Sequence, residues 1–316
     1  MSNNLLIAGA GQLGSRYLQG LALFDKPLNI WVYDISEASL EQARHRWEDC
    51  SCSLHDIKYV SSLSMLPVKL DVVCVTSNSD VRLALIQEIV KHTEVRFWIL
   101  EKLLVQRFAD LSEVAKATSD AEGVWVNTPM YLWPLYSNLR KNFPKNLPVQ
   151  ASFMGISGLA CNAIHYIDYI SRWNSAAVTE VDTSGLNPVW VPSKRAGFYE
   201  AEGQLAIRFT DGSSLIIAGN TELKAYDVNV EVIVDGEVWL VDEEKGRAVK
   251  GENTIKGNIL HQSELFAPLL REIFQNGVCN LPTLDMSIAQ HAPLIRSLLA
   301  HWNFNMPEKL EYLPIT

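Results

Sequence analysis

Residues 5–14 read LLIAGAGQLG, an apolar run that ends in three glycines. The run Leu5–Ala8 is typical of a short buried strand, and Gln12–Leu23 after it has the apolar spacing of a helix. Gly9, Gly11 and Gly14 fit the pattern G-x-G-x-x-G, which carries information mainly where it joins a strand to a helix. The pattern has that context here, so we expect a turn built to approach a ligand.

Each glycine has a separate physical role in such a turn. Gly9 permits the tight bend, Gly11 lets the backbone approach a pyrophosphate, and Gly14 lets the helix pack closely on the strand. The helix that starts at Gln12 and Leu13 offers free amides and its positive dipole end to the phosphates. The alternative is a structural glycine turn that binds nothing.

Asp34 strengthens the dinucleotide interpretation. It lies 20 residues beyond Gly14 and directly follows Asn29–Tyr33, a second run rich in strand formers. A carboxylate at the end of the second strand accepts hydrogen bonds from the ribose hydroxyls and repels a 2′-phosphate. We therefore expect NAD as the cofactor, and NADP stays possible because Ser36 and Arg44 lie nearby in the sequence.

The first 125 residues continue to alternate strand and helix patterns. Asp71–Thr76 and Arg96–Leu100 are further candidates for buried strands, and Ser36–Trp47 and Val81–His92 have helical spacing. Near-continuous apolar strands alternating with helices predict a parallel sheet covered on both faces. Residues 1–125 are therefore predicted to form an α/β, doubly wound dinucleotide-binding (Rossmann) domain.

The pattern changes to alternation with a period of two in the remainder, residues 126–316. Residues 205–209 and 215–218 flank Asp211-Gly212, and residues 228–234 and 238–241 flank Asp235-Gly236, which is a strong hairpin signal. We predict an α+β domain with a largely antiparallel, mostly meandering open sheet that has one exposed face. Three helix patterns flank that sheet: Cys161–Trp173, Ser263–Gln275 and Leu284–His301.

Composition excludes several classes of protein. The 316 residues include 36 acidic and 27 basic side chains, a net charge of -9, which disfavours a nucleic-acid partner. The opening apolar run is too short for a membrane span and lacks the features of a secretory signal. The five cysteines show no metal-binding spacing, so we expect no metal and a reducing, cytoplasmic location.

Taken together, these motifs and their order resemble the Gfo/Idh/MocA oxidoreductases, the family of glucose–fructose oxidoreductase and inositol dehydrogenase. The resemblance implies an NAD(P)-dependent enzyme of carbohydrate metabolism that acts on CH–OH donors. Hydride would pass between nicotinamide and a secondary alcohol or ketone of a sugar, nucleotide sugar or cyclitol. The resemblance to this family rests on residues 9–14, Asp34, Val72–Thr76 with Ser77-Asn78, Glu101-Lys102, Val126-Asn127 and the helix with His165 and Asp168.

The resemblance also implies roles for residues after the fourth and fifth strands. Lys102 matches the lysine of the family's E-K-P signature and would be catalytic. Glu101 matches the glutamate and, with Ser77 and Asn78, would contact the cofactor. Leu103 stands where the family has proline.

On the first helix of the second domain, His165 matches the histidine of the family's D-x-x-x-H and would transfer the proton. The carboxylate position of that motif is Cys161, which is the largest departure from the family pattern. A thiol is mostly neutral at pH 7, whereas an aspartate is charged. Asn162 lies three residues before His165 and, with Cys161 and Asn127, is a candidate for substrate contact. Asp168 is expected to be structural.

Two other functions stay open at this point. Cys161 favours, as an alternative, a reductase of a C=N or conjugated substrate, similar to the imine and biliverdin reductases of the same family. A non-catalytic dinucleotide-binding sensor is the other alternative. The family also implies that residues 126–316 bind the substrate and form a homo-oligomer, a dimer or tetramer, through the second sheet.

Overall fold

The computed structural model describes residues 2–222 and 228–316, and they form two compact units. The first unit contains residues 2–105, 109–127 and 260–284, and the second contains the other described residues. The division into domains after residue 125 stays a prediction. What the sequence pattern did not indicate is that residues 260–284 return to the first unit.

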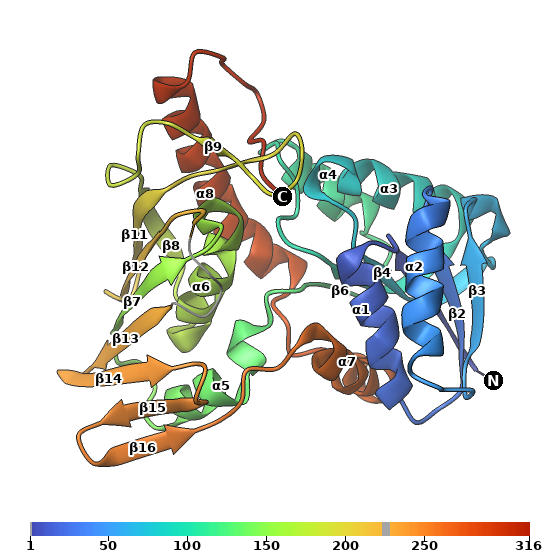
Figure 1. Ribbon diagram of the computed structural model, residues 1–316, viewed down its shortest axis with the longest axis horizontal. Coiled ribbons are helices and arrows are strands. Elements are labelled where there is room, and N and C mark those ends of the chain that lie inside the picture. The colour runs from blue at the N-terminus through green and yellow to red at the C-terminus, as the bar shows by residue number, and fades with distance from the viewer. Residues whose placement is uncertain (1, 223–227) are drawn as a thin grey trace. The chain divides into compact units, whose positions relative to one another are not determined.

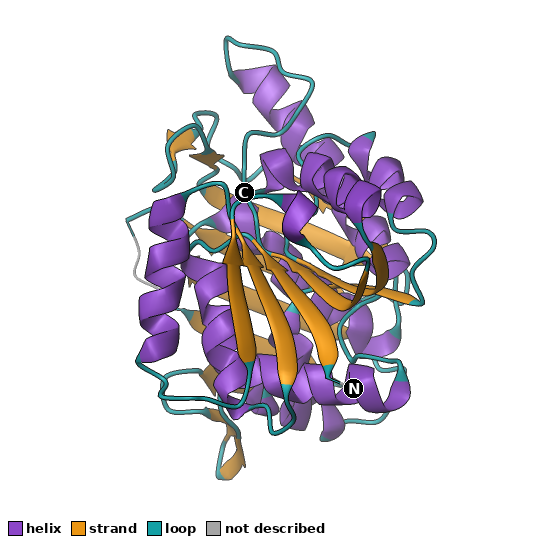
Figure 2. Ribbon diagram, turned by 90° about the vertical axis from the view of Figure 1, so that its right-hand side faces the viewer, coloured by secondary structure: helices purple, strands orange, loops and turns teal. Residues whose placement is uncertain are grey.

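Six parallel strands form the sheet of the first unit (Figures 1 and 2). Their order is β3-β2-β1-β4-β5-β6, the order of a classic doubly wound sheet. The predicted Rossmann architecture is therefore confirmed. The strands are β1 (Asn3–Ala8), β2 (Leu28–Tyr33), β3 (Asp56–Val60), β4 (Lys69–Val75), β5 (Glu94–Leu100) and β6 (Gly123–Val126).

Helices cover both faces of this sheet, α1, α2 and α7 on one side and α3 and α4 on the other (Figure 1). The unexpected member is α7, because the sequence pattern placed residues 263–275 beside the second sheet. It packs on α1 instead, with the rings of Tyr17 and Phe266 4.6 Å apart. The helices are α1 (Gln12–Gly20), α2 (Glu37–Glu48), α3 (Ser79–His92), α4 (Asp110–Ala117), α7 (Gln262–Asn276) and the short η1 (Leu21–Leu23) and η2 (Leu63–Met65).

The second unit contains an eight-stranded sheet in the order β16-β15-β14-β13-β7-β12-β11-β8. Both predicted hairpins, β11–β12 and β13–β14, are confirmed, and the sheet is largely antiparallel. It is not a simple meander, because β7 lies between β13 and β12 and runs parallel to β12. The strands are β7 (Val149–Ile156), β8 (Val178–Asp182), β11 (Gly203–Phe209), β12 (Ser214–Gly219), β13 (Asn229–Val234), β14 (Glu237–Asp242), β15 (Arg247–Lys250) and β16 (Asn253–Lys256).

One face of the second sheet is covered by helices and the other is open. On the covered face, α6 packs against β7 and β12, and α5 packs against β15 and β16. The open face carries Met154, Ile216, Val238 and Leu240, all at least 37% exposed. The remaining elements are α5 (Pro134–Lys141), α6 (Leu159–Asn174), α8 (Leu284–Asn305), η3 (Pro129–Leu132) and the two-stranded β9 (Val191–Pro192) and β10 (Tyr199–Glu200).

Across the described ranges, no helix combines the length and the apolar character that a membrane crossing requires.

Candidate functional site

The glycine turn lies between β1 and α1, beside the point where the strand order reverses. Gly9 has φ of +111°, and its amide donates to the carbonyl of Tyr33 at 2.8 Å. A Cβ on Gly14 would lie 1.8 Å from the Gly9 carbonyl oxygen, so only glycine lets α1 begin this close to the strand. Thr76, after β4, donates its hydroxyl to the same carbonyl at 2.6 Å. Three chain segments therefore meet at one peptide group.

The start of α1 has the features that a pyrophosphate site needs. Gly11 is the N-terminal cap, and none of the described side chains caps the helix, so its first-turn amides lack both an intrahelical and a side-chain partner. A Cβ on Gly11 would meet no atom within 4 Å, which leaves open space at the turn. Arg46 on α2 holds this end of α1 by donating to the Gln12 side chain at 2.6 Å.

Asp34 has a second role that the motif did not indicate. Its Oδ2 accepts from the amide of Ala10 at 2.8 Å, and its Oδ1 accepts from the amide of Ser36 at 2.9 Å. The carboxylate therefore ties the glycine turn to the end of β2. Each oxygen keeps a second lone pair, so the same group can still accept ribose hydroxyls.

Ser36 and Arg44, the two residues that kept NADP possible as the cofactor, both make contacts within the protein. The Ser36 hydroxyl caps α2 by accepting from the amide of Ser39 at 3.3 Å. Arg44 pairs with Glu41 at 3.2 Å and lies over the ring of Tyr59, 4.9 Å from its centroid. The preference for NAD over NADP stays a prediction.

Glu101 is buried, with 3% of its surface exposed, and it joins several elements of the first unit. Its Oε1 accepts from the Tyr17 hydroxyl at 2.5 Å and from Nδ2 of Asn127 at 2.6 Å. Asn127 also donates to Gln262 on α7, at 2.8 Å. Burial raises the pKa of Glu101, and these hydrogen bonds oppose the rise. Glu101 and Asn127 thus have structural roles, and the contacts to cofactor and substrate expected for them stay predictions.

Ser77, Asn78 and Lys102 all follow strand ends at the same edge of the first sheet. β4 and β5 pair in register, with Val75 beside Leu100, so the two loops start side by side. Ligands of doubly wound sheets bind at this carboxyl edge. The peptide bond after Lys102 is cis. The positions suit the predicted roles, which stay predictions.

Arg82 on α3 is a structural residue of these loops that motif analysis missed. It is 1% exposed and donates to the backbone carbonyls of Ser77, Leu103 and Leu104. One guanidinium therefore holds the loop after β4 to the loop after β5. The sequence did contain a signal, because Arg82 falls at the helical spacing of the buried positions of α3.

In the second unit, the predicted site residues lie on the first two turns of α6. Cys161, Asn162 and His165 are half-buried. The Cys161 thiol donates to the carbonyl of Gly158 at 3.4 Å, and Nδ2 of Asn162 donates to the carbonyl of Ser157 at 2.9 Å. Their functional roles stay predictions.

Asp168 is fully buried one turn beyond His165, which accords with the structural role expected for it. Gln290 donates to its Oδ1 at 3.1 Å, and Nη1 of Arg172 lies 3.8 Å from its Oδ2. Burial raises the pKa of Asp168 from the ordinary 3.8 to about 6, and Arg172 only partly offsets this.

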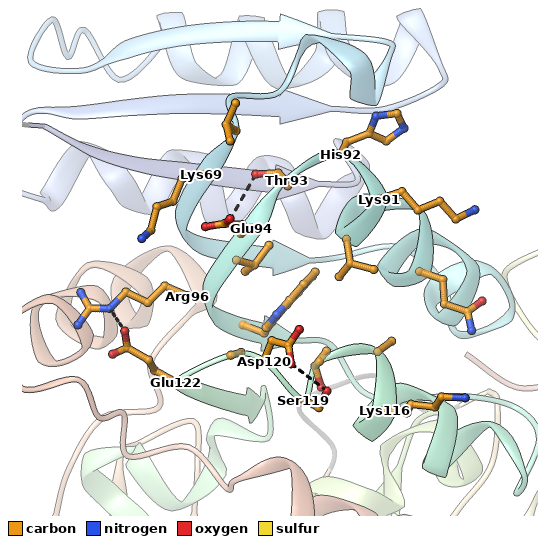
Figure 3. A pocket seen from close by; sticks show the side chains of 18 of the residues that line it. Lys69, Lys91, His92, Thr93, Glu94, Arg96, Lys116, Ser119, Asp120 and Glu122 are labelled. Carbon is orange, nitrogen blue, oxygen red and sulfur yellow. Dashed lines mark hydrogen bonds and ion pairs between the residues drawn. The ribbon is translucent and has the colours of Figure 1, made fainter.

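A hollow of about 1040 Å³ lies at the opposite, amino-terminal edge of the first sheet (Figure 3). Lys91, His92 and Lys116 belong to the last turns of α3 and α4, where cations stabilise the helix dipole. Arg96 and Glu122 pair at 2.7 Å. These residues have structural explanations, so we place the candidate site at the carboxyl edge.

Solved structures with this fold include UDP-N-acetylglucosamine 3-dehydrogenase GnnA from Acidithiobacillus ferrooxidans, with a TM-score of 0.69 and 12% identity over 95% of this chain and 97% of that one. Myo-inositol 2-dehydrogenase from Lactobacillus plantarum gives 0.67 and 13% over 94% and 96%. Biliverdin reductase from Synechocystis, in complex with biliverdin and NADP+, gives 0.69 and 13% over 93% and 97%. No family model matches the sequence, and no curated protein does.

These neighbours are of the Gfo/Idh/MocA type. This chain has the Gfo/Idh/MocA fold. Strand order in the first unit and the open sheet in the second match that fold over nearly the whole length of both chains. The fold expected from the motifs is therefore confirmed, and identities near 12% leave substrate and chemistry to the residues themselves.

We predict that Asp168→Asn stabilises the protein above pH 6. A raised pKa means that ionising Asp168 costs stability, so its contribution is complete below about pH 4 and is lost as pH rises through about 6. The variant should gain up to about 3 kcal/mol in unfolding free energy at pH 8 and little at pH 4. Urea denaturation at both pH values measures the difference.

The exposed Asp120→Asn, which removes one negative charge elsewhere, is the matched control. Lower stability of Asp168→Asn at both pH values would show that the ionised pair with Arg172 stabilises the fold instead.

Proposed function

We propose that the protein is an NAD-dependent oxidoreductase that acts on a secondary alcohol or ketone of a sugar, nucleotide sugar or cyclitol. The observation that carries the proposal is the glycine turn at the strand-order switch, with Asp34 bound to it. Its first-turn amides and the space beside Gly11 fit a pyrophosphate. The neighbours that act on a nucleotide sugar and on inositol support the substrate class.

The residues would divide the chemistry as follows. When bound, the nicotinamide supplies or accepts hydride at its C4. The Lys102 ammonium would donate a hydrogen bond to the reacting oxygen and stabilise the negative charge that develops there. His165 would take the hydroxyl proton during oxidation and return it during reduction, because imidazole exchanges protons near neutral pH. Asn162 would orient the substrate or the imidazole.

The second candidate is a reductase of a C=N or conjugated substrate. Cys161 favours it, because the thiol removes the ordinary carboxylate partner of the histidine on α6. The Synechocystis neighbour is a reductase of such a molecule.

Gly11→Val is expected to weaken NADH binding at least about tenfold, or ~1.4 kcal/mol. The side chain enters open space, so folding is spared while the pyrophosphate loses its approach. Quenching of tryptophan fluorescence gives the dissociation constant, and an unchanged melting temperature is the control. Wild-type protein should bind NADH more tightly than NADPH. Unchanged affinity in the variant would remove the basis for the cofactor site.

Lys102→Met is expected to keep NADH affinity and to lose about 10²–10³-fold in kcat, as happens when an electrostatic stabiliser is removed. Nicotinamide absorbance measures turnover over a panel of cyclitols, sugars and nucleotide sugars. Biliverdin and cyclic imines are tested in parallel.

Lys69→Met, at the opposite edge of the sheet, is the matched control. Full activity in Lys102→Met would exclude the lysine from catalysis. Turnover of only biliverdin or imines would favour the second candidate.

We also propose that the protein works in the cytoplasm as a homo-oligomer, a dimer or tetramer that pairs through the open face of the second sheet. Exposed Met154, Ile216, Val238 and Leu240 give that face an apolar surface. The odd number of cysteines, five, and the lack of a C-x-x-C in the sequence fit a reducing compartment.

Leu240→Glu should dissociate the oligomer, because a carboxylate buried at the interface costs several kcal/mol. Sedimentation velocity compares it with wild type and with Val68→Glu, which changes an aliphatic side chain exposed in the first unit. A monomeric wild-type protein would contradict the proposal.

A further inference from the structure

A carboxylate from β10, in the same unit, accepts hydrogen bonds from the amides at the start of α6. Glu200 at the end of β10 is buried, with 6% of its surface exposed. Its Oε2 accepts from the amide of Ala160 at 2.9 Å and from that of Cys161 at 3.3 Å. These are the second and third residues of α6, where a helix presents free amides and the positive end of its dipole. That setting favours the ionised form of a carboxyl group.

The other oxygen of Glu200 lies beside the side chains that precede His165. A methyl group on Gly158 would be 3.0 Å from the Cys161 sulfur, 3.3 Å from Nδ2 of Asn162 and 3.4 Å from Oε1 of Glu200. The three atoms therefore all lie close around Gly158, at the start of α6. The carboxylate thus lies close to position 161, where the resemblance expects a carboxylate and this chain has a thiol.

His165 is four residues beyond Cys161 and three beyond Asn162, so all three lie on neighbouring positions of one helical face. We propose that Glu200 supplies to His165, from β10, the negative charge that α6 lacks at position 161, and that it thereby acts as a positioning residue for proton transfer. The proposal rests on the proposed function of His165. It explains why the loss of the helix carboxylate need not inactivate the site.

Charged and titratable groups other than Glu200 also lie around α6 and could act on His165. The strands β7 and β12 bring no titratable side chain to the helix. The titratable residues of α6 are Cys161, His165, Tyr166, Asp168, Tyr169 and Arg172; those of the elements that contact it are Tyr131 on η3, Tyr136, Arg140 and Lys141 on α5, Tyr199 and Glu200 on β10, and Asp285, His291, Arg296 and His301 on α8. Glu243, after β14, also acts on the helix, because burial and then the Glu243 charge raise the pKa of Tyr166. Asp168 and Glu243 are the rival carboxylates. Gln290 donates to Asp168 and the Arg172 charge lies 3.8 Å away, and Glu243 accepts from the Tyr136 hydroxyl.

The test is the titration of His165 by NMR in the full-length protein, with His165→Gln assigning its signal among the seven histidines. Glu200→Gln keeps an oxygen that can accept both amides of α6, so it removes the charge and keeps the cap. The titration midpoint of His165 should fall by about 0.5–1 unit in this variant. Adding Cys161→Asp to Glu200→Gln should restore it, because that change places the carboxylate on the helix.

Glu202→Gln is the matched control, since Glu202 is two residues away and its carboxylate binds Thr221 at 2.7 Å. An unchanged midpoint in Glu200→Gln, or an equal fall in Glu202→Gln, would overturn the proposal. So would a fall in Asp168→Asn alone or in Glu243→Gln alone.

If Glu200→Gln does not fold, Cys161→Asp alone decides. Beside an existing carboxylate, a second one stays largely protonated. The midpoint should then change by less than about 0.3 unit, whereas a rise of about 1 unit would show that no carboxylate acted there before. The titration needs no substrate, so it stands or falls separately from turnover. Where turnover is found, the lower limb of the pH profile of kcat should move with the midpoint.

Discussion

The contact between Gly14 and the carbonyl of Gly9 is the constraint on which the first unit depends. A helix can start directly against the end of β1 only because no side-chain atom stands between the two glycines. That approach brings the first amides of α1 to the place where β1 and β4 separate. Asp34, after β2, and Thr76, after β4, then hold the same turn from the two strands that flank β1. The position of these first-turn amides is thus a consequence of the tight packing of helix on strand.

Buried carboxylates are the second theme, and the chain stabilises each by a different means. Glu101 accepts hydrogen bonds from the Tyr17 phenol and the Asn127 side-chain amide, and burial still raises its pKa. Asp168 lies beside the Arg172 guanidinium and accepts a hydrogen bond from the Gln290 side-chain amide, and burial raises its pKa to about 6. Glu200 receives two backbone amides at a helix start. A carboxylate held by the fixed backbone dipoles of a helix start is well suited to act on a histidine of the same helix.

Motif spacing and periodicity predicted the architecture and the glycine turn, because both depend on local backbone requirements. They did not predict that α7 packs on α1 or that β7 lies at the centre of its sheet. An amphipathic pattern shows which face of an element is buried, but it does not show which other element covers that face. Within the candidate site, Asp34 was predicted as a ligand of ribose but not as a brace of the turn. Arg82 left a helical signal, whereas Glu200 belongs to a two-residue strand that leaves none.

The return of residues 260–284 to the first unit has a consequence for biosynthesis. The ribosome releases the glycine turn and all six parallel strands early, but α7 and Gln262, which complete the packing around α1 and Asn127, emerge only after the whole second sheet. The nascent chain must therefore carry an incomplete first unit while the second sheet is made. The packing around α1 is therefore completed only after the strands of the second sheet have been synthesised.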